Sequence, residues 1–336
     1  MDSEEEMKQN LILAYGIMVY NHVCQFERLL KAIWRPSHIY CIHIDSDASP
    51  IVLHNYQELL KCFPNMFLSS RRVDVRWGEF SVLEADLICM KDLLTVKSPN
   101  WSYYLNLNSH EYPLKTNLEL LKILKILNGA NSIHKTMPLR WRFNNRLPPI
   151  NVTLWKGEFH IIACRGFVDY VINNQIAQQL INWSSNTAIP DETVNHQTIN
   201  HNPQLGAPGS YAGLFSTKFS PYFHRFKHWY NECPYGAFDC SACGSQEWRS
   251  GICIMGLRDL ARLTDLSNPA LFVNKIFSDF QPRTLDCLES WHTKRIRDEL
   301  EIEMELNDGE SVNYNFYRSL NVIKYHVPCA PFQVTT

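Results

Sequence analysis

The sequence predicts an α/β fold with a mainly parallel central sheet that is flanked by helices. Of the 336 residues, 45% are hydrophobic and 20% are charged, a composition that is typical of globular proteins and excludes disordered and fibrous chains. Between residues 14 and 106, short apolar segments alternate with segments of helical periodicity. No internal repeat and no Gly/Ser linker divides the chain, so we expect one domain in two lobes.

The alternating elements occupy the first third of the chain. The predicted strands are 14–20, 38–45, 66–68 and 101–106, and the predicted helices are 26–34, 51–62 and 81–94. Strands that are connected through helices run parallel in one sheet. Because ligands of such sheets bind beyond the carboxyl ends of the strands, Asp45 and the segment 106–111 lie on the expected binding rim.

The second half of the chain, from about residue 130, holds most of the Pro, Trp and loop signals. Its one clear helix is predicted from Gly166 to about Trp183. We expect this half to supply binding loops over a core that it shares with the first half. Residues 1–12 are predicted to be an acidic segment before the domain, and residues 328–336 a tail after it.

Charge and hydropathy argue against two classes of protein. The 32 Lys and Arg residues against 34 Asp and Glu give a net charge of −2, which disfavours a general nucleic-acid-binding protein and a polybasic membrane-surface protein. The longest apolar stretch, residues 11–20, is about half of the roughly 20 residues that a bilayer crossing needs. The acidic segment 1–12 lacks the features of a signal peptide, and taken alone it predicts a cytosolic protein.

The cysteines indicate a different compartment. The chain has eleven, a number that favours an oxidising lumen and several disulfides. Because the count is odd, at least one thiol is unpaired or has its partner outside this chain. Glycosylation sequons at Asn100, Asn151 and Asn182 are compatible with the same compartment.

The motifs of dinucleotide-binding, Walker-type, zincin and α/β-hydrolase proteins are all missing. Asp45-Ser46-Asp47, at the end of the second strand, could hold a divalent metal against a diphosphate, since hard cations prefer carboxylate oxygens. The alternative is an ordinary turn, in which Asp is also common. Pro190-Asp191-Glu192 could supply a catalytic carboxylate, or could open a helix whose dipole favours acids.

Two further features allow two interpretations each. The run Cys233, Cys240, Cys243 and Cys253 could ligate zinc, although a second pair at zinc-ribbon spacing is missing. In an oxidising compartment these cysteines would form disulfides instead. The cations Arg249 and Lys275 could belong to a binding site, or could be solvated surface charges, as most Arg and Lys residues are.

Several blocks, in order and at matching spacing, resemble the core-2/I-branching β-1,6-N-acetylglucosaminyltransferase family between Ala14 and Trp291. The blocks are 14–20 (AYGIMVY), 28–33, 40–45, 85–92, 112–119, 190–192 (PDE), 208–210 (PGS), 249–253 and 271–275, with Cys287 beyond them. The resemblance implies a GT-A-type glycosyltransferase fold that uses UDP-GlcNAc, inverts the sugar carbon and needs no metal. It also implies a nucleotide-binding lobe at about 13–128 and an acceptor and catalytic lobe at about 129–327.

The resemblance assigns roles to single residues. Glu192 is similar to the general base that takes the proton of the acceptor hydroxyl. Arg249 and Lys275 resemble the cations that neutralise the diphosphate, as a metal does elsewhere. Asp45 resembles a residue that contacts the uridine, and only this first Asp of the Asp-x-Asp pair is kept in the family.

Other positions fall near the donor or the acceptor. By resemblance, Met18, Tyr20 and Trp77 lie near the nucleotide. The acceptor side would be formed by Glu111, Arg140, Trp229 and Tyr230, with the two aromatic residues as a platform for a sugar. Ile133-His134 departs from the family, whose members place an acceptor-binding Glu there.

The same resemblance pairs Cys41 with Cys89 and Cys253 most simply with Cys243. It matches Cys62 and Cys287 to positions whose partners lie in an N-terminal stem. Family members are type II Golgi membrane proteins with an N-terminal anchor and a stem, and we recognise neither segment in this chain. The resemblance therefore predicts a lumenal Golgi domain and an expected membrane anchor that this chain lacks.

We therefore expect an enzyme that transfers GlcNAc to a hydroxyl of a glycoprotein O-glycan and makes a β-1,6 branch. One alternative is a xylosyl- or glucuronosyl-type transferase of the same superfamily. A second is an inactive family member, although the retention of Glu192, Arg249 and Lys275 argues against decay. A third, from another class, is a cytosolic protein stabilised by zinc.

Overall fold

The computed structural model describes residues 3–97, 100–135, 146–187, 195–213, 223–229, 243–305 and 312–329. Its centre is a six-stranded sheet in the order β3-β2-β1-β4-β7-β6. The strands are β1 (Leu13–Val19), β2 (Ile39–Ile44), β3 (Met66–Leu68), β4 (Tyr103–Asn108), β6 (Ser132–Ile133) and β7 (Ile161–Cys164). β1 to β4 run parallel, whereas β7 is antiparallel to both β4 and β6. The predicted α/β fold with a mainly parallel sheet is confirmed.

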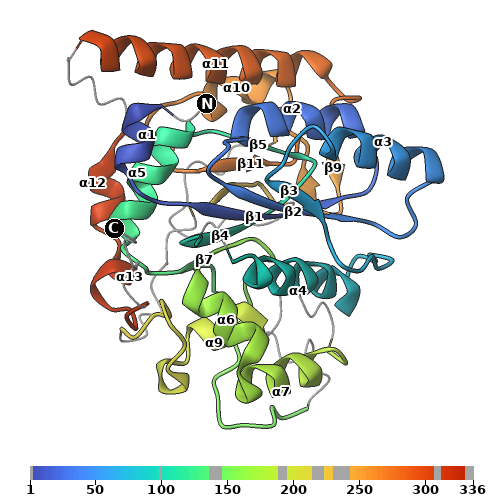
Figure 1. Cartoon of the computed structure of the whole chain (residues 1–336), viewed down its shortest axis with the longest axis vertical. Coiled ribbons are helices and arrows are strands. Elements are labelled where there is room, and N and C mark those ends of the chain that lie inside the picture. Colours follow the sequence, from blue (N-terminus) through green and yellow to red (C-terminus); the bar gives the residue numbers. More distant parts are fainter. Residues whose placement is uncertain are drawn as a thin grey trace.

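Helices cover both faces of this sheet (Figure 1). Helices α2 (Val23–Ile33) and α3 (Pro50–Leu60) lie on one side, and α4 (Phe80–Thr95) lies on the other. These are the three helices that the apolar periodicity predicts. Both β1 and β2 are buried almost throughout, as expected for strands between two helical layers.

Two further helices outside the alternating unit complete the core. α5 (Asn117–Leu127) begins with a capping box, in which Thr116 and Glu119 satisfy each other's backbone N–H groups. α11 (Pro282–Glu305) packs beside α2, where Arg28 forms ion pairs with Asp286 and Glu289. The shorter helices are α1 (Glu4–Lys8), α9 (Asn195–Asn200), η2 (Pro203–Leu205), η3 (Leu257–Asp259), α10 (Leu260–Leu263), α12 (Tyr314–Arg318) and α13 (Asn321–Lys324).

Residues before the first strand are part of the packed structure. Glu6, on α1, is buried and accepts hydrogen bonds from Arg35 Nε at 3.0 Å and from Asn117 Nδ2 at 2.9 Å. These contacts join the predicted acidic segment to α5 and to the end of α2. Among the helices of the described residues, none combines the length and apolar composition of a membrane crossing.

The helix predicted from Gly166 to about Trp183 is wrong as a single helix. The segment 166–183 forms two helices, α6 (Arg165–Asn173) and α7 (Gln175–Ser184). Between them Asn174 is extended, and its side chain accepts hydrogen bonds from the backbone N–H groups of Ile176 and Ala177. The apolar periodicity continues through this point, but an Asn side chain that caps a new helix replaces the backbone hydrogen bonds of a continuous one.

A second sheet of three strands lies beside the first. Its order is β5 (Glu111–Pro113), β11 (Phe272–Asn274) and β8 (Arg225–Phe226). β11 pairs antiparallel with β5 and parallel with β8. A separate hairpin consists of β9 (Trp248–Arg249) and β10 (Ile252–Cys253). The pairing of β5 with β11 joins residues that are more than a hundred positions apart in the sequence.

Three disulfides are present in the described residues. Cys41–Cys89 and Cys243–Cys253 confirm the predicted pairings. The third bond, Cys164–Cys329, was not predicted, and it ties the beginning of the predicted tail to the end of β7.

Three other described cysteines, Cys24, Cys62 and Cys287, are unpaired and exposed. The resemblance places the partners of Cys62 and Cys287 in an N-terminal stem, and that pairing stays a prediction. With both sulfur atoms in a disulfide, Cys243 and Cys253 are not available as zinc thiolates, which removes two ligands from the zinc alternative.

Candidate functional site

The carboxyl ends of β1 and β2 carry the first predicted site residues. Tyr20 directly follows β1 and is 46% exposed, and Asp45 directly follows β2 and is buried. Asp45 Oδ1 accepts a hydrogen bond from Asp47 N at 2.9 Å, and Oδ2 accepts one from Val75 N at 3.2 Å. Asp45 thus organises a turn and holds the loop that leads to Trp77, which is 71% exposed.

The contacts of Asp45-Ser46-Asp47 are those expected of an ordinary turn. Each carboxylate oxygen of Asp45 accepts a backbone N–H, and such contacts are common for Asp at the end of a strand. No group of three or more His, Cys, Asp or Glu in the described part of the chain is arranged to hold a metal ion. Met18, near the end of β1, packs against Val73 and Ala85 below the same loop.

Arg249 stands at the end of β9, before a two-residue turn. Ser250 and Gly251 have positive φ angles of 51° and 75°, which is the conformation of a type I′ hairpin turn. Gly251 has no Cβ to oppose this conformation, and it permits the tight connection from Arg249 to its cross-strand partner Ile252.

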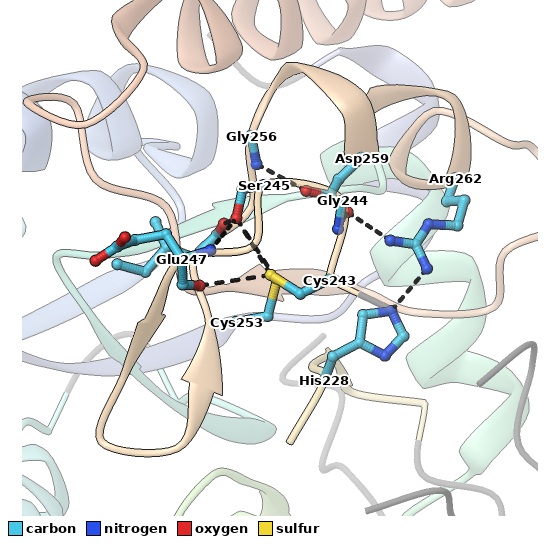
Figure 2. Close-up of a disulfide and its surroundings, with 10 residues drawn as sticks. His228, Cys243, Gly244, Ser245, Glu247, Cys253, Gly256, Asp259 and Arg262 are labelled. Atoms are coloured by element: carbon cyan, nitrogen blue, oxygen red, sulfur yellow. Dashed lines mark hydrogen bonds and ion pairs between the residues drawn. A yellow bond between two sulfur atoms is a disulfide. The ribbon is translucent and has the colours of Figure 1, made fainter. Parts of the chain in front are cut away.

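The base of this loop is fixed covalently and by a buried acid (Figure 2). The Cys243–Cys253 disulfide closes it, while Asp259 accepts hydrogen bonds from Gly244 N at 3.0 Å and Gly256 N at 2.9 Å. Arg262 pairs with Asp259 and donates to His228 Nε2 at 3.1 Å. The hairpin that carries Arg249 is therefore held in place from two directions.

Arg249 lies on an aromatic support, and the backbone beside Lys275 bonds to His110, which is part of that support. The guanidinium of Arg249 lies 4.2 Å from the ring centroid of Phe277, and that ring stacks on His110 at 4.2 Å. Lys275 is connected to the same region, because its carbonyl accepts a hydrogen bond from Met255 N at 2.9 Å. Burial lowers the pKa of His110 to about 4, and His22, Lys275 and Arg249 act in the same direction.

Glu111 lies fully buried between the two sheets. Its Oε1 accepts hydrogen bonds from Arg225 Nε and from His160 Nε2, both at 2.8 Å. Asn274 Nδ2 donates to the same oxygen at 2.9 Å. Burial by itself raises the pKa of this carboxyl, but Arg225 and His160 outweigh burial and hold the pKa well below its usual value.

A second buried acid, Glu158, continues this network. Lys227 Nζ donates to Glu158 Oε2 at 2.7 Å and to His160 Nδ1 at 3.1 Å. Trp229 Nε1 donates to Glu158 Oε1 at 3.2 Å. Since His160 accepts from Lys227 at Nδ1, its proton is on Nε2, where it faces Glu111, as a neutral ring requires. Burial lowers the pKa of His160 to about 4.

Comparison with known proteins identifies the family. The family model of the Core-2/I-Branching enzyme matches residues 13–263. The chain belongs to this family.

Curated relatives agree with this assignment. The chain is 31% identical over 314 residues to "Beta-1,3-galactosyl-O-glycosyl-glycoprotein beta-1,6-N-acetylglucosaminyltransferase 3" of Rattus norvegicus, and 32% identical over 314 residues to the Homo sapiens protein of the same name. Each alignment covers 86% of this chain and 69% of the relative. A similarly named protein of Bovine herpesvirus 4 is 31% identical over 308 residues, with the same coverage. The chain is a glycosyltransferase.

Among solved structures, apo mouse Xyloside xylosyltransferase 1 is similar at 12% sequence identity. The match covers 51% of this chain and 73% of that chain, with a TM-score of 0.27. This TM-score is too low to support an argument about the fold.

Within this Core-2/I-branching fold, the structure brings some of the predicted site residues together and not others. Arg249 and the backbone beside Lys275 both lie near His110, and Trp229 pairs with Ile252 on the hairpin of Arg249. Tyr20, Asp45 and Trp77 follow the neighbouring strand ends. Predicted residues outside the described part of the chain are Arg140, Glu192 and Tyr230. The roles of all these residues stay predictions.

Lys275 is half-buried in an electropositive surrounding. Burial lowers its pKa, and the neighbouring cations Lys227 and Arg249 lower it further, while Glu111 opposes them. Cations held this close to one another gain stabilisation when an anion enters between them, because the anion relieves their repulsion. The arrangement therefore favours a diphosphate or another compact anion.

Sequence reasoning missed several residues of this Core-2/I-branching site. They are Glu158, His160, Arg225 and Lys227, whereas His110 lies within the segment 106–111 of the expected binding rim. A weak signal existed, since Arg225 to Trp229 (RFKHW) interleaves cations with aromatic residues directly before the predicted platform. Glu158 and His160 gave no signal, because their partners come from distant segments of the chain.

Proposed function

We propose that the protein is an inverting glycosyltransferase that moves GlcNAc from UDP-GlcNAc to a hydroxyl of a glycoprotein O-glycan and forms a β-1,6 branch. The observation that carries this proposal is that Arg249 and Lys275 approach His110 from separate segments: Arg249 lies on the Phe277 ring that stacks on His110, and Ile276, next to Lys275, donates to His110 O. The names of the relatives, which act on β-1,3-galactosyl O-glycosyl glycoproteins, support the choice of acceptor.

The proposed reaction is a single displacement. The acceptor hydroxyl oxygen attacks C1 of GlcNAc from the side opposite the leaving group, and the bond between C1 and the diphosphate oxygen breaks. The proton of the hydroxyl passes to the carboxylate of Glu192, and UDP leaves with the bonding electron pair. Arg249 and Lys275 stabilise the negative charge that develops on the diphosphate.

Two fixed cations could take the place of a divalent ion, so we propose that the reaction needs no metal. The test measures released UDP for a panel of UDP-sugars, with β-1,3-galactosyl O-glycopeptides as acceptors and EDTA present. We expect turnover with UDP-GlcNAc in the presence of EDTA, and we expect added divalent ions not to raise its rate. Turnover with UDP-xylose or UDP-glucuronate alone would overturn the assigned donor, and complete loss of activity in EDTA would overturn metal independence.

The predicted base gives a further test. Replacing Glu192 by Gln removes the proton acceptor but keeps the size of the side chain. We expect turnover to fall by at least about a hundredfold, the scale of a lost general base, while UDP binding measured by calorimetry persists. Glu301→Gln, at an exposed position of α11, serves as the matched control. A Glu192→Gln enzyme with a near-normal rate contradicts this role.

The compartment belongs to the same proposal. The disulfides indicate folding in an oxidising environment, which agrees with a protein of the secretory pathway. We propose the Golgi lumen as the site of action, where donor nucleotide-sugar and O-glycan acceptor meet. Immunolocalisation of the expressed gene product together with a Golgi marker tests this location.

A further inference from the structure

A buried ion pair lies beside the predicted acceptor platform, and the proposed reaction gives it no role. Lys227 and Glu158 are joined at 2.7 Å, and their side chains are only 5% and 11% exposed. A charge in such a place is costly unless it is paired and hydrogen-bonded. Burial raises the pKa of Glu158, but Lys227 and His134 outweigh burial and hold the pKa below its usual value. The carboxylate is therefore ionised.

The two oxygens of this carboxylate have different partners. Oε2 accepts from the ammonium of Lys227, and Oε1 accepts from the indole N–H of Trp229 at 3.2 Å. Lys227 is fixed in turn by His160, to which it donates at 3.1 Å. The indole is only half-buried, so its hydrogen bond sets the orientation of a ring that still has accessible surface.

Glu158 also stands where three parts of the site meet. Its backbone carbonyl accepts a hydrogen bond at 2.6 Å from Gln197, on helix α9, which begins three positions after Glu192. Lys227 directly follows β8, whose last residue Phe226 pairs with Val273 of β11, and its charge lowers the pKa of Lys275. Trp229 pairs with Ile252, the cross-strand partner of Arg249. One carboxylate thus connects the aromatic platform to the strands that carry both donor cations.

We infer that Glu158 is a positioning residue: it holds the indole of Trp229 in the orientation that stacks on the acceptor sugar, with Lys227 fixing the carboxylate. This inference rests on the proposed function, because it takes Trp229 as the acceptor platform. A ring held by a charge-assisted hydrogen bond pays no ordering cost when the sugar binds. Removing that bond weakens acceptor binding and leaves the chemistry at the donor unchanged.

The kinetic test compares Glu158→Gln with Trp229→Phe, which keeps an aromatic face but has no indole N–H. For each variant we expect the acceptor KM to rise about tenfold, with kcat and the KM for UDP-GlcNAc within about threefold of wild type. The double variant should resemble Glu158→Gln alone, because both changes remove the charge-assisted hydrogen bond between the carboxylate and the indole N–H. Glu301→Gln, exposed on α11, should behave as wild type.

Two kinetic results would overturn the inference. One is a fall in kcat with an unchanged acceptor KM, which indicates a purely structural role. The other is an additive effect of the two substitutions, which indicates that they act independently. If Glu158→Gln does not fold, Trp229→Phe alone decides the question, because it leaves the Glu158–Lys227 pair intact.

A second measurement does not depend on turnover. In protein with ¹⁵N-labelled tryptophan, the indole resonance that disappears in Trp229→Phe belongs to Trp229. We expect it to move upfield in Glu158→Gln, where the carboxylate is lost, and to move in wild type when a β-1,3-galactosyl O-glycopeptide is added. If the wild type transfers no sugar, the proposed function fails, and this titration still tests the inference. A Trp229 resonance that is insensitive to Glu158→Gln or to the glycopeptide would overturn it.

Discussion

At the residue scale, the site depends on buried charges that are each matched by several partners. Glu111 Oε1 accepts from three side chains, and Glu158 engages both of its oxygens. Interactions of this kind are strong inside a protein, because little water competes for the same donors. Among the described residues, the two cations nearest the expected diphosphate have fewer hydrogen-bond and ion-pair partners than these acids. Burial and the neighbouring cations lower the pKa of Lys275, and the guanidinium of Arg249 packs on the face of Phe277.

Lys275→Met tests this cation directly. The change keeps most of the side-chain length and removes the charge, so we expect turnover to fall by about a hundredfold, the scale of one lost charge-stabilising group. Lys294→Met, at an exposed position of α11, is the control. An unchanged rate in assays of released UDP would exclude Lys275 from the donor site.

The pH dependence of turnover gives a second test of Lys275. Because burial, Lys227 and Arg249 lower the pKa of Lys275 from 10.5, the side chain loses its charge at a lower pH than an ordinary lysine. Turnover of wild type should therefore decline on the alkaline side before pH 10.5 is reached. Lys275→Arg keeps its charge throughout that range, and its residual activity should not show this decline.

At the scale of elements, helix α11 completes the start of α5. Arg295 donates to Leu114 O at 3.0 Å and pairs with Glu119 of the capping box. One turn further on, Glu299 accepts a hydrogen bond from Thr116 Oγ1. Burial raises the pKa of Glu299 to about 7; Glu119 and Glu6 add to the rise, whereas Thr116 and Arg295 oppose it.

This contact makes helix packing sensitive to pH. The folded-state pKa of Glu299 lies above the unfolded value of 4.5, so the unfolded chain loses its proton first and stability falls as pH rises through about 7. We expect Glu299→Gln to match wild type at pH 5 and to unfold at a higher temperature than wild type at pH 8. Thermal unfolding monitored by circular dichroism measures both, with Glu301→Gln as the control. A constant difference at all pH values would contradict this explanation.

The hairpin of β9 and β10 depends on its covalent base. Replacing Cys243 and Cys253 together by Ala leaves Asp259 and its hydrogen bonds but frees the loop that carries Arg249. We expect turnover to fall at least tenfold, because a misplaced cation stabilises the leaving group less well. Cys62→Ala, which removes an exposed unpaired thiol, should have no effect. Equal activity of the two variants in the released-UDP assay would show that the disulfide does not position Arg249.

At the scale of the whole molecule, eight buried or half-buried histidines among the described residues make the folded state sensitive to acid. Burial lowers the pKa of each, to about 3 or 4 where a value is resolved. They are His38, His43, His110, His134, His160, His201, His224 and His292. The folded chain keeps these rings neutral at pH values at which the unfolded chain protonates them.

Acid should therefore unfold the protein cooperatively. Between pH 6.5 and 4 the unfolded state binds more protons than the folded state, so stability falls as pH falls. Glu299 changes stability in the opposite direction over part of this range, but it is one group against eight. We expect the unfolding temperature to drop across the range, with net proton uptake in calorimetry. The Glu299→Gln variant removes the contribution of Glu299, which opposes that of the histidines. An unfolding temperature that does not change with pH in this variant would refute the explanation.

The sequence by itself determined the strands and helices of the first third, because alternating apolar runs and helical periodicity are local properties. It also determined the family and two disulfide pairings, through blocks of residues that keep their order and spacing. Local pattern failed at Asn174, where a capping side chain divides a helix that the periodicity predicts as continuous.

Only the tertiary structure decided what surrounds the site. Glu111, Arg225 and Asn274 meet because β5, β8 and β11 pair across long sequence separations. Glu158 reaches Trp229 in the same way, and Cys164 reaches Cys329 across 165 positions. These contacts depend on how the strands pack together, and apolar periodicity carries no information about which distant polar side chains will share a buried, water-poor space.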